Sequence, residues 1–200
     1  MHKMLLNLPN QLETDRLILR CYQAGDGPMY FRAGQRNREH LHRFEAGNAI
    51  LEPTTEEQAE TLVLELVAEW EARRHFFWGV FEKATGEFAG QVYIGPVSWE
   101  IPEFEVGYFA DRDHAGHGYI TEAVWAALGF IFNDLHARRA SLNCSAANIR
   151  SQRIAERCGF TLEGHLRLDH RNPDGSLEDS LHYGLLREDY ERTNSRSSGS

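Results

Sequence analysis

The chain has 200 residues, 42% of them apolar, which suits a single domain with a sizeable core. Its formal net charge of −9 disfavours a nucleic-acid partner, which requires a basic surface, and suits a cationic partner such as an amine. The three cysteines are far apart and form no Cys/His cluster, so we expect neither disulfides nor a metal site. No signal peptide or membrane-spanning run is present, so we expect a cytoplasmic protein with no membrane partner.

The first half of the chain predicts strands and helices after a short lead over residues 1–11. Thr55, followed by two glutamates, is a good helix start, and an apolar stripe at helical spacing continues from there to Trp70. The pair Thr85-Gly86 predicts a turn within an antiparallel meander of three strands. Helices are expected around 29–34 and 36–46 and from 55 to 70. Strands are expected at 12–22, 76–81, 87–98 and 104–110.

The second half predicts a helix from about 118 to 135, a strand at 138–144 and a further helix over 148–157 with Gly159 as its C-cap. A final hairpin, 162–170 and 177–186, surrounds the turn signal of residues 172–175. The polar residues 193–200 are expected to be a disordered tail after one domain that covers 12–192.

Two glycines one residue apart, Gly116 and Gly118, lie between the expected strand at 104–110 and the helix that follows. Glycine permits unusual dihedral angles and close approach, and the first N–H groups of a helix have no internal partner. Such a corner can bind phosphate. The third glycine of a dinucleotide fingerprint and the lysine of an NTPase loop are missing, so a Rossmann or P-loop site is disfavoured, and a plain strand-to-helix turn stays an alternative.

Three motifs in this order resemble the GNAT N-acetyltransferase superfamily, and within it the ribosomal-protein N-terminal acetyltransferases of the RimL/RimJ type. The motifs are Glu105 to Tyr108, Gly116 to Ala123, and Asn148-x-x-Ser151 followed by Cys158-Gly159-Phe160. The resemblance covers roughly residues 12–190. It implies an α+β fold with three layers, in which helices flank a mixed, mostly antiparallel, splayed central sheet.

The resemblance implies that acetyl-CoA is the co-substrate. Its pantetheine arm is expected to pair with the strand that holds Tyr108, Phe109 and Ala110. Asn148 is an N-cap candidate and a further cofactor contact. The diphosphate is expected on the backbone of Ala115, Gly116, His117, Gly118, Tyr119, Ile120 and Thr121.

For the chemistry, the resemblance implies that Ser151 protonates the leaving sulfur, because Ala155 replaces the tyrosine that many family members use. Cys144 either accompanies Ser151 or is a small core residue. Two residues are comparable candidates for the base. Glu105 either acts through water or only orients the ammonium, and His170 either accepts the proton or is a solvated strand residue.

The resemblance implies acetyl transfer to a primary amine in a ternary complex, most of all to a protein N-terminus. Transfer to a small amine, such as a polyamine, an antibiotic or an amino acid, is one alternative. A CoA-binding module without catalysis is another. The resemblance also allows a homodimer.

Overall fold

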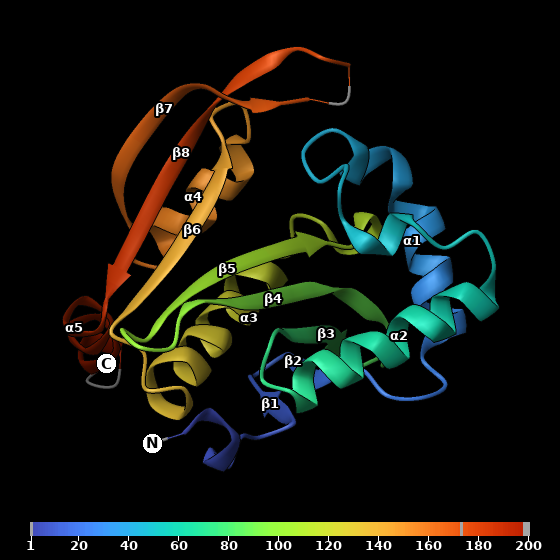
Figure 1. Ribbon diagram of the computed structural model, residues 1–200, viewed down its shortest axis with the longest axis horizontal. Helices are drawn as coiled ribbons and strands as arrows, with labels where there is room; N and C mark the ends of the chain where they lie inside the picture. The colour runs from blue at the N-terminus through green and yellow to red at the C-terminus, as the bar shows by residue number, and fades with distance from the viewer. Residues whose placement is uncertain (1, 173, 198–200) are drawn as a thin grey trace.

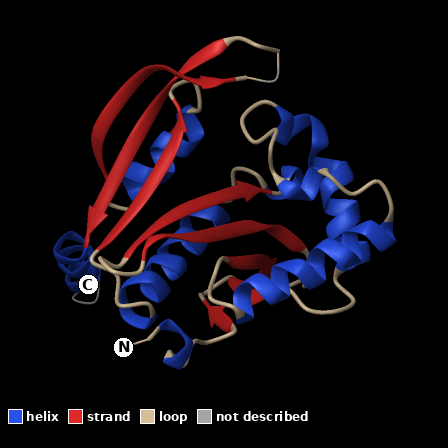
Figure 2. Cartoon of the chain, in the orientation of Figure 1, coloured by secondary structure: helices blue, strands red, loops and turns tan. Residues whose placement is uncertain are grey.

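The computed structural model describes residues 2–172 and 174–197, whose strands form one eight-stranded sheet (Figures 1 and 2). The strands are β1 (Gln11–Glu13), β2 (Leu17–Cys21), β3 (Phe76–Glu82), β4 (Phe88–Ser98), β5 (Glu103–Ala110), β6 (Arg139–Ser145), β7 (Thr161–Arg171) and β8 (Leu177–Leu186). Their order in the sheet is β1-β2-β3-β4-β5-β6-β8-β7, and β5 with β6 is the parallel pair among antiparallel ones. The predicted mixed, mostly antiparallel sheet is confirmed.

Helices cover both faces of this sheet, which confirms the predicted three-layer α+β fold (Figure 1). The longer helices are α1 (Gly27–His42), α2 (Glu56–Glu71), α3 (Tyr119–Gly129), α4 (Ile149–Arg157) and α5 (Arg187–Ser197). The shorter ones are η1 (Lys3–Leu5), η2 (Ala49–Leu51), η3 (Arg112–His114) and the π-turn η4 (Phe130–Asp134). Tyr30 and Val63 bury their side chains in the core under α1 and α2, whereas Trp78 and Val124 belong to the core under α3.

The sheet opens between β5 and β6. The two strands pair only where residues 103–105 of β5 face residues 139–141 of β6. Beyond Glu105 they diverge, and Figure 1 shows β6, β8 and β7 as a wing that leans away from β5. Among the described residues, 106–110 of β5 therefore pair with β4 and leave their other edge open, which confirms the predicted splay.

Two expected elements of the N-terminal region are wrong. The single strand at 12–22 is a hairpin of β1 and β2, because Thr14 turns the chain by accepting a hydrogen bond from the N–H of Leu17 at 2.9 Å. The two short helices at 29–34 and 36–46 are one helix, α1. Gly34 does not break it, since the glycine is needed for packing: a Cβ there would lie 2.2 Å from the carbonyl oxygen of Ile50.

Helix α5 continues to Ser197, into the segment 193–200 that we expect from the sequence to be a disordered tail. Ser198 to Ser200 lie outside the described residues, as does Pro173 in the turn of the final hairpin. That hairpin itself, β7 and β8, is confirmed. Within the described ranges we find no helix with both the length and the apolar character that a membrane span requires.

Candidate active site

The connection from β5 to α3 has the backbone conformation that an anion site needs. Gly116 and Gly118 adopt φ values of +90° and +79°, which side-chain-bearing residues rarely adopt, and Gly118 is the N-cap of α3. A Cβ on Gly116 would meet nothing within 4 Å, so the backbone there borders open space. The free N–H groups at the start of α3 and the helix dipole favour negative charge at this corner.

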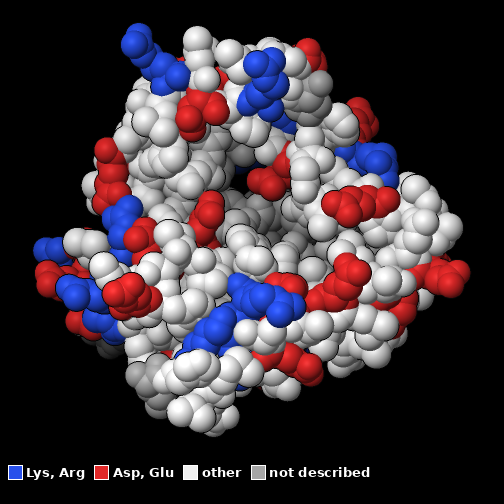
Figure 3. Space-filling view, viewed as in Figure 1, with Lys and Arg blue, Asp and Glu red and all other residues white. Residues whose placement is uncertain are grey.

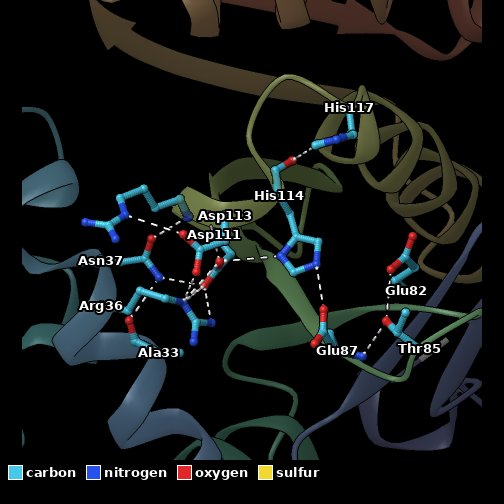
Figure 4. Close-up of polar contacts among 11 residues, drawn as sticks. Ala33, Arg36, Asn37, Glu82, Thr85, Glu87, Asp111, Asp113, His114 and His117 are labelled. Carbon is cyan, nitrogen blue, oxygen red and sulfur yellow. Dashed lines mark hydrogen bonds and ion pairs between the residues drawn. The ribbon is translucent and has the colours of Figure 1, made fainter.

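Helix α1 holds the start of this connection through the buried carboxylate of Asp111 (Figure 4). Arg36 donates to Asp111 at 2.5 Å, and Asn37 donates to it at 2.8 Å. Asn37 also accepts from the backbone N–H of Arg112 at 2.7 Å. Burial alone would raise the pKa of Asp111, but the hydrogen bonds from Arg36, Asn37 and the N–H of Asp113 outweigh burial and lower it. The connection from β5 to α3 thus begins at an ionised carboxylate that α1 holds in place.

Asp113 opens the motif with a carboxylate, which would repel phosphate if it were uncompensated. Its oxygens lie 3.4 Å from Nε of Arg36 and 3.5 Å from Nε of Arg112, so two guanidinium groups balance its charge. A third guanidinium, that of Arg16, donates to the carbonyl oxygen of His117 at 3.0 Å and would lie 3.6 Å from a Cβ on Gly118. The sequence reasoning missed Arg16 as a cation beside the corner, because only the pairing of distant segments brings it there.

The remaining residues of the predicted diphosphate corner contribute mainly backbone. Tyr119 donates its hydroxyl hydrogen to Glu82, and its ring stacks on His117 with centroids 5.6 Å apart. Ile120 is buried in the core, and Thr121 is half-buried. On β5, the side chain of Phe109 is likewise buried in the core, so Phe109 offers only its backbone to a ligand in the open gap.

Ser151 lies on the α4 side of the gap between β5 and β6, against Tyr108. The two side-chain oxygens are 2.9 Å apart, and the Tyr108 hydroxyl also donates to the backbone carbonyl of Ser151 at 3.2 Å. Burial raises the pKa of Tyr108. Burial also raises the pKa of the Cys144 thiol, which a hydrogen bond with Ser151 partly offsets. Tyr108, Cys144 and Ser151 therefore form one cluster of exchangeable protons from β5, β6 and α4, and the hydroxyl of Tyr108 is a functional group that sequence reasoning missed.

Asn148 is the predicted N-cap of α4: its side-chain oxygen accepts from the N–H of Ser151 at 3.1 Å. This bond fixes the first turn of α4 and therefore the place of the Ser151 hydroxyl. Ala155, one helical turn later, is fully buried.

The two base candidates lie apart. Glu105 is at the point where β5 and β6 diverge, and its carboxylate accepts from the Asn143 side chain at 3.3 Å. His170 is an exposed residue of β7, opposite Glu178 and separated from β6 by the width of β8. The structure brings Glu105 to the gap but does not bring His170 to Ser151.

Glu45 lies on the segment of residues 43–48 that follows α1, and its carboxyl interacts electrostatically with Glu105 and Tyr108 of β5. This segment and the end of β7 line a hollow of about 550 Å³, which includes Glu45, Asn48 and His170. Figure 3 shows a hollow at the centre of the molecule with acidic side chains around it. No sequence pattern marked Glu45.

A second acidic group lies beyond the anion corner. Ligand atoms of Glu82, Glu87 and His114 lie within 4.8 Å of one another, close enough for a shared cation. However, Thr85 donates its hydroxyl hydrogen to Glu82, and His114 pairs with Glu87 at 3.4 Å (Figure 4). Tyr119 also donates its hydroxyl hydrogen to Glu82. These contacts explain the arrangement without an ion.

Comparison with known proteins agrees with this geometry. A family profile described as an acetyltransferase (GNAT) domain matches residues 16–161. The chain is 30% identical over 161 residues to the uncharacterized protein YkkB of Bacillus subtilis (strain 168), which covers 78% of this chain and 87% of YkkB. It is 36% identical over 63 residues to the ribosomal-protein-serine acetyltransferase of Escherichia coli (strain K12), or 32% of this chain and 35% of that protein.

Among solved structures, RimL, described as a ribosomal L7/L12 alpha-N-protein acetyltransferase in complex with coenzyme A, has a TM-score of 0.78 at 20% identity. The superposition covers 90% of this chain and 97% of that one. The resemblance to the ribosomal-protein branch is thus confirmed. The exposed backbone at the start of α3 fits the phosphates of coenzyme A, and the open edge of β5 fits its pantetheine arm. The chain therefore belongs to the GNAT acetyltransferase family and is an N-acetyltransferase that uses acetyl-CoA.

Proposed function

We propose that the chain transfers the acetyl group of acetyl-CoA to the α-amine of a protein N-terminus, by direct attack in a ternary complex. Two findings support this acceptor. Several relatives and structural neighbours are named as ribosomal-protein acetyltransferases, and two carboxylates, those of Glu45 and Glu105, lie close enough to interact and suit an approaching ammonium.

The observation that carries the proposal is that the two sides of the gap differ in chemistry. Phe104 and Val106 of β5 join the core under α3, and Tyr108 packs on that same side against Ser151. Glu105, between them in an alternating strand, faces the opposite side. Proton donors therefore lie on one side and carboxylates on the other, as a transfer between a sulfur and an amine requires.

Each residue then has a defined task. The backbone from Ala115 to Thr121 holds the diphosphate, and the open edge of residues 108–110 pairs with the pantetheine arm. A backbone N–H of Phe109 or Ala110 donates to the oxyanion that develops on the acetyl group. Ser151 donates its hydroxyl proton to the departing sulfur and is reprotonated through the Tyr108 hydroxyl, which regains its own proton from solvent.

A panel of acceptors tests the proposal. Thiol release from acetyl-CoA is measured with a peptide that begins with Ser or Ala, with the same peptide blocked at its N-terminus, and with spermidine. We expect turnover with the free peptide and none with the blocked one, and mass spectrometry should place the acetyl group on the α-amine. Turnover with spermidine but not with the peptide would assign the enzyme to small amines instead.

The size of the hollow gives the small-amine alternative its support, because about 550 Å³ between residues 44–48 and the end of β7 suffices for a small molecule. The proton donors and the family membership disfavour the third reading, a CoA-binding module without catalysis.

A further inference from the structure

Glu45 occupies a position from which it can reach the acetyl-acceptor side of the gap. Its N–H donates to the carbonyl oxygen of Leu41 at 2.7 Å, so the backbone of Glu45 is held against the last turn of α1. Its carboxyl interacts electrostatically with Glu105, and also with Tyr108, both on β5. It therefore lies near the part of β5 where the acetyl group is delivered.

The charged surroundings of Glu45 come from three elements. On its own segment Asn48 donates a hydrogen bond to the carboxylate, and on β5 Glu105 adds a second negative charge. On β7, His170 and Arg171 line the same hollow and are both exposed to solvent, which screens them. A carboxylate pair without a buried cation between them is a suitable site for the ammonium of a substrate.

We propose that Glu45 is the catalytic base that accepts the proton of the attacking amine, while Glu105 orients the ammonium; the proposal rests on the proposed function. The Glu45 carboxylate takes one proton from the bound ammonium, and the freed lone pair forms the N–C bond to the acetyl carbon. The C–S bond breaks as Ser151 gives its proton to the sulfur. The second amine proton leaves to solvent when the amide forms.

The protonation of Glu45 supports this role. The residue as a whole is exposed, but protein surrounds its carboxyl, and this loss of solvation raises the carboxyl pKa to about 7. The hydrogen bond from Asn48 acts to lower this pKa, and the negative charge of Glu105 acts to raise it. A base with a pKa near the working pH transfers protons most effectively. Since the carboxylate is the active form, kcat/KM should rise with pH through about 7. A second rise should follow at higher pH, as the free acceptor α-amine, with a pKa of about 7.7–8.0, loses its own proton.

The test compares Glu45→Gln, Glu45→Asp and the control Glu39→Gln, which removes the same charge from an exposed site on α1. We expect Glu45→Gln to lower kcat/KM about 100-fold and to abolish the rise near pH 7, with acetyl-CoA affinity and melting temperature retained. Glu45→Asp should keep that rise at reduced rate, and Glu39→Gln should match the wild type.

A second measurement excludes a merely structural role. The deficit of Glu45→Gln should shrink as the acceptor amine becomes less basic, because such amines lose their proton without help. A Glu45→Gln enzyme that keeps the rise near pH 7, or whose deficit is the same for every amine, overturns the assignment. If the wild type acetylates only small amines, the proposed acceptor is wrong and the same comparison is made with spermidine; if it acetylates no amine, both proposals fall.

Discussion

Ser151 and Tyr108 share a hydrogen bond across the seam between α4 and β5, with their oxygens 2.9 Å apart. Neither group is strongly acidic, since burial raises the pKa of Tyr108 and a serine hydroxyl is a weaker acid still. A pair of this kind can nonetheless stabilise the developing thiolate by hydrogen bonding and pass a proton to it, because negative charge builds on the sulfur as the C–S bond breaks. In the proposed mechanism, Ser151 and Tyr108 therefore protonate the sulfur during C–S cleavage and are neutral at other times.

Ser151→Ala should lower kcat by about 10²-fold or more and leave the Kd of acetyl-CoA nearly unchanged. Tyr108→Phe should lower kcat as well. The activation free energy of the double variant should rise by much less than the sum of the two single effects, because both hydroxyls belong to one proton path. Steady-state kinetics with binding titrations of coenzyme A check this. Cys21→Ala, which removes a thiol on β2 outside this cluster, is the control, and unchanged kcat in Ser151→Ala would remove the hydroxyl from the mechanism.

At the scale of elements, α1 links the two halves of the site. Its middle, through Arg36 and Asn37, anchors Asp111 before the phosphate corner. Its end leads into the segment that carries Glu45, which lines the hollow proposed for the acceptor. One rigid helix thus sets the spacing between cofactor and acceptor, and a change in its middle should be felt at both ends.

Asp111→Asn should destabilise the fold by roughly 3 kcal/mol at neutral pH, because it breaks a buried, paired carboxylate. The pKa of Asp111 is lowered in the folded state, so its stabilisation is present above the unfolded pKa of about 3.9 and is lost as pH falls through the lower folded pKa. The free energy of unfolding, measured with urea, should therefore differ by a constant amount between variant and wild type from pH 5 to 8. This difference should decrease below about pH 4.

The control for that experiment is Asp113→Asn, which removes a carboxylate from the same loop that also contacts Arg36, yet is 55% exposed. An exposed pair contributes about 1 kcal/mol or less. Equal losses in the two variants would contradict the role of Asp111 as the buried anchor.

Some features of the fold and of the site could be predicted from the sequence and others could not, for physical reasons. Gly116 and Gly118 were informative because positive φ is a local requirement that glycine meets. The two helices expected on either side of Gly34 are one helix. Gly34 is required by its close contact with Ile50 and does not end a helix, and such a tertiary contact leaves no local signal in the sequence. Glu45 was invisible for the same reason: an isolated glutamate acquires its role from Glu105, sixty residues away along the chain.

On the scale of the whole molecule, the divergence of β5 from β6 divides the sheet into two wings, whose strands pair at residues 103–105 and 139–141 within the described part of the chain. A ligand in this gap contacts β5, α3 and α4 at once, so it should hold the wings together. Binding should therefore alter the dynamics of both wings and not only of the contact residues.

Hydrogen exchange with and without coenzyme A checks this. Amides within residues 106–110 that point away from β4, and those of 116–121, should become protected, while those of β2 should not change. Gly118→Val should weaken the protection by blocking the corner. Gly25 has a similar positive φ, +96° against +79°, and no atom within 4 Å of a Cβ placed on it, so Gly25→Val should lose stability without losing the protection. Protection confined to other segments would place the nucleotide elsewhere.

The position of the β7–β8 hairpin along the chain has an evolutionary consequence. Every proposed contact with the thioester lies between residues 108 and 151, whereas the hairpin occupies residues 161–186. Acceptor preference can therefore drift through insertions, deletions or recombination in this C-terminal module while the acyl donor is retained. A chimera that receives the hairpin of a relative should inherit new acceptors and keep its original Kd for acetyl-CoA.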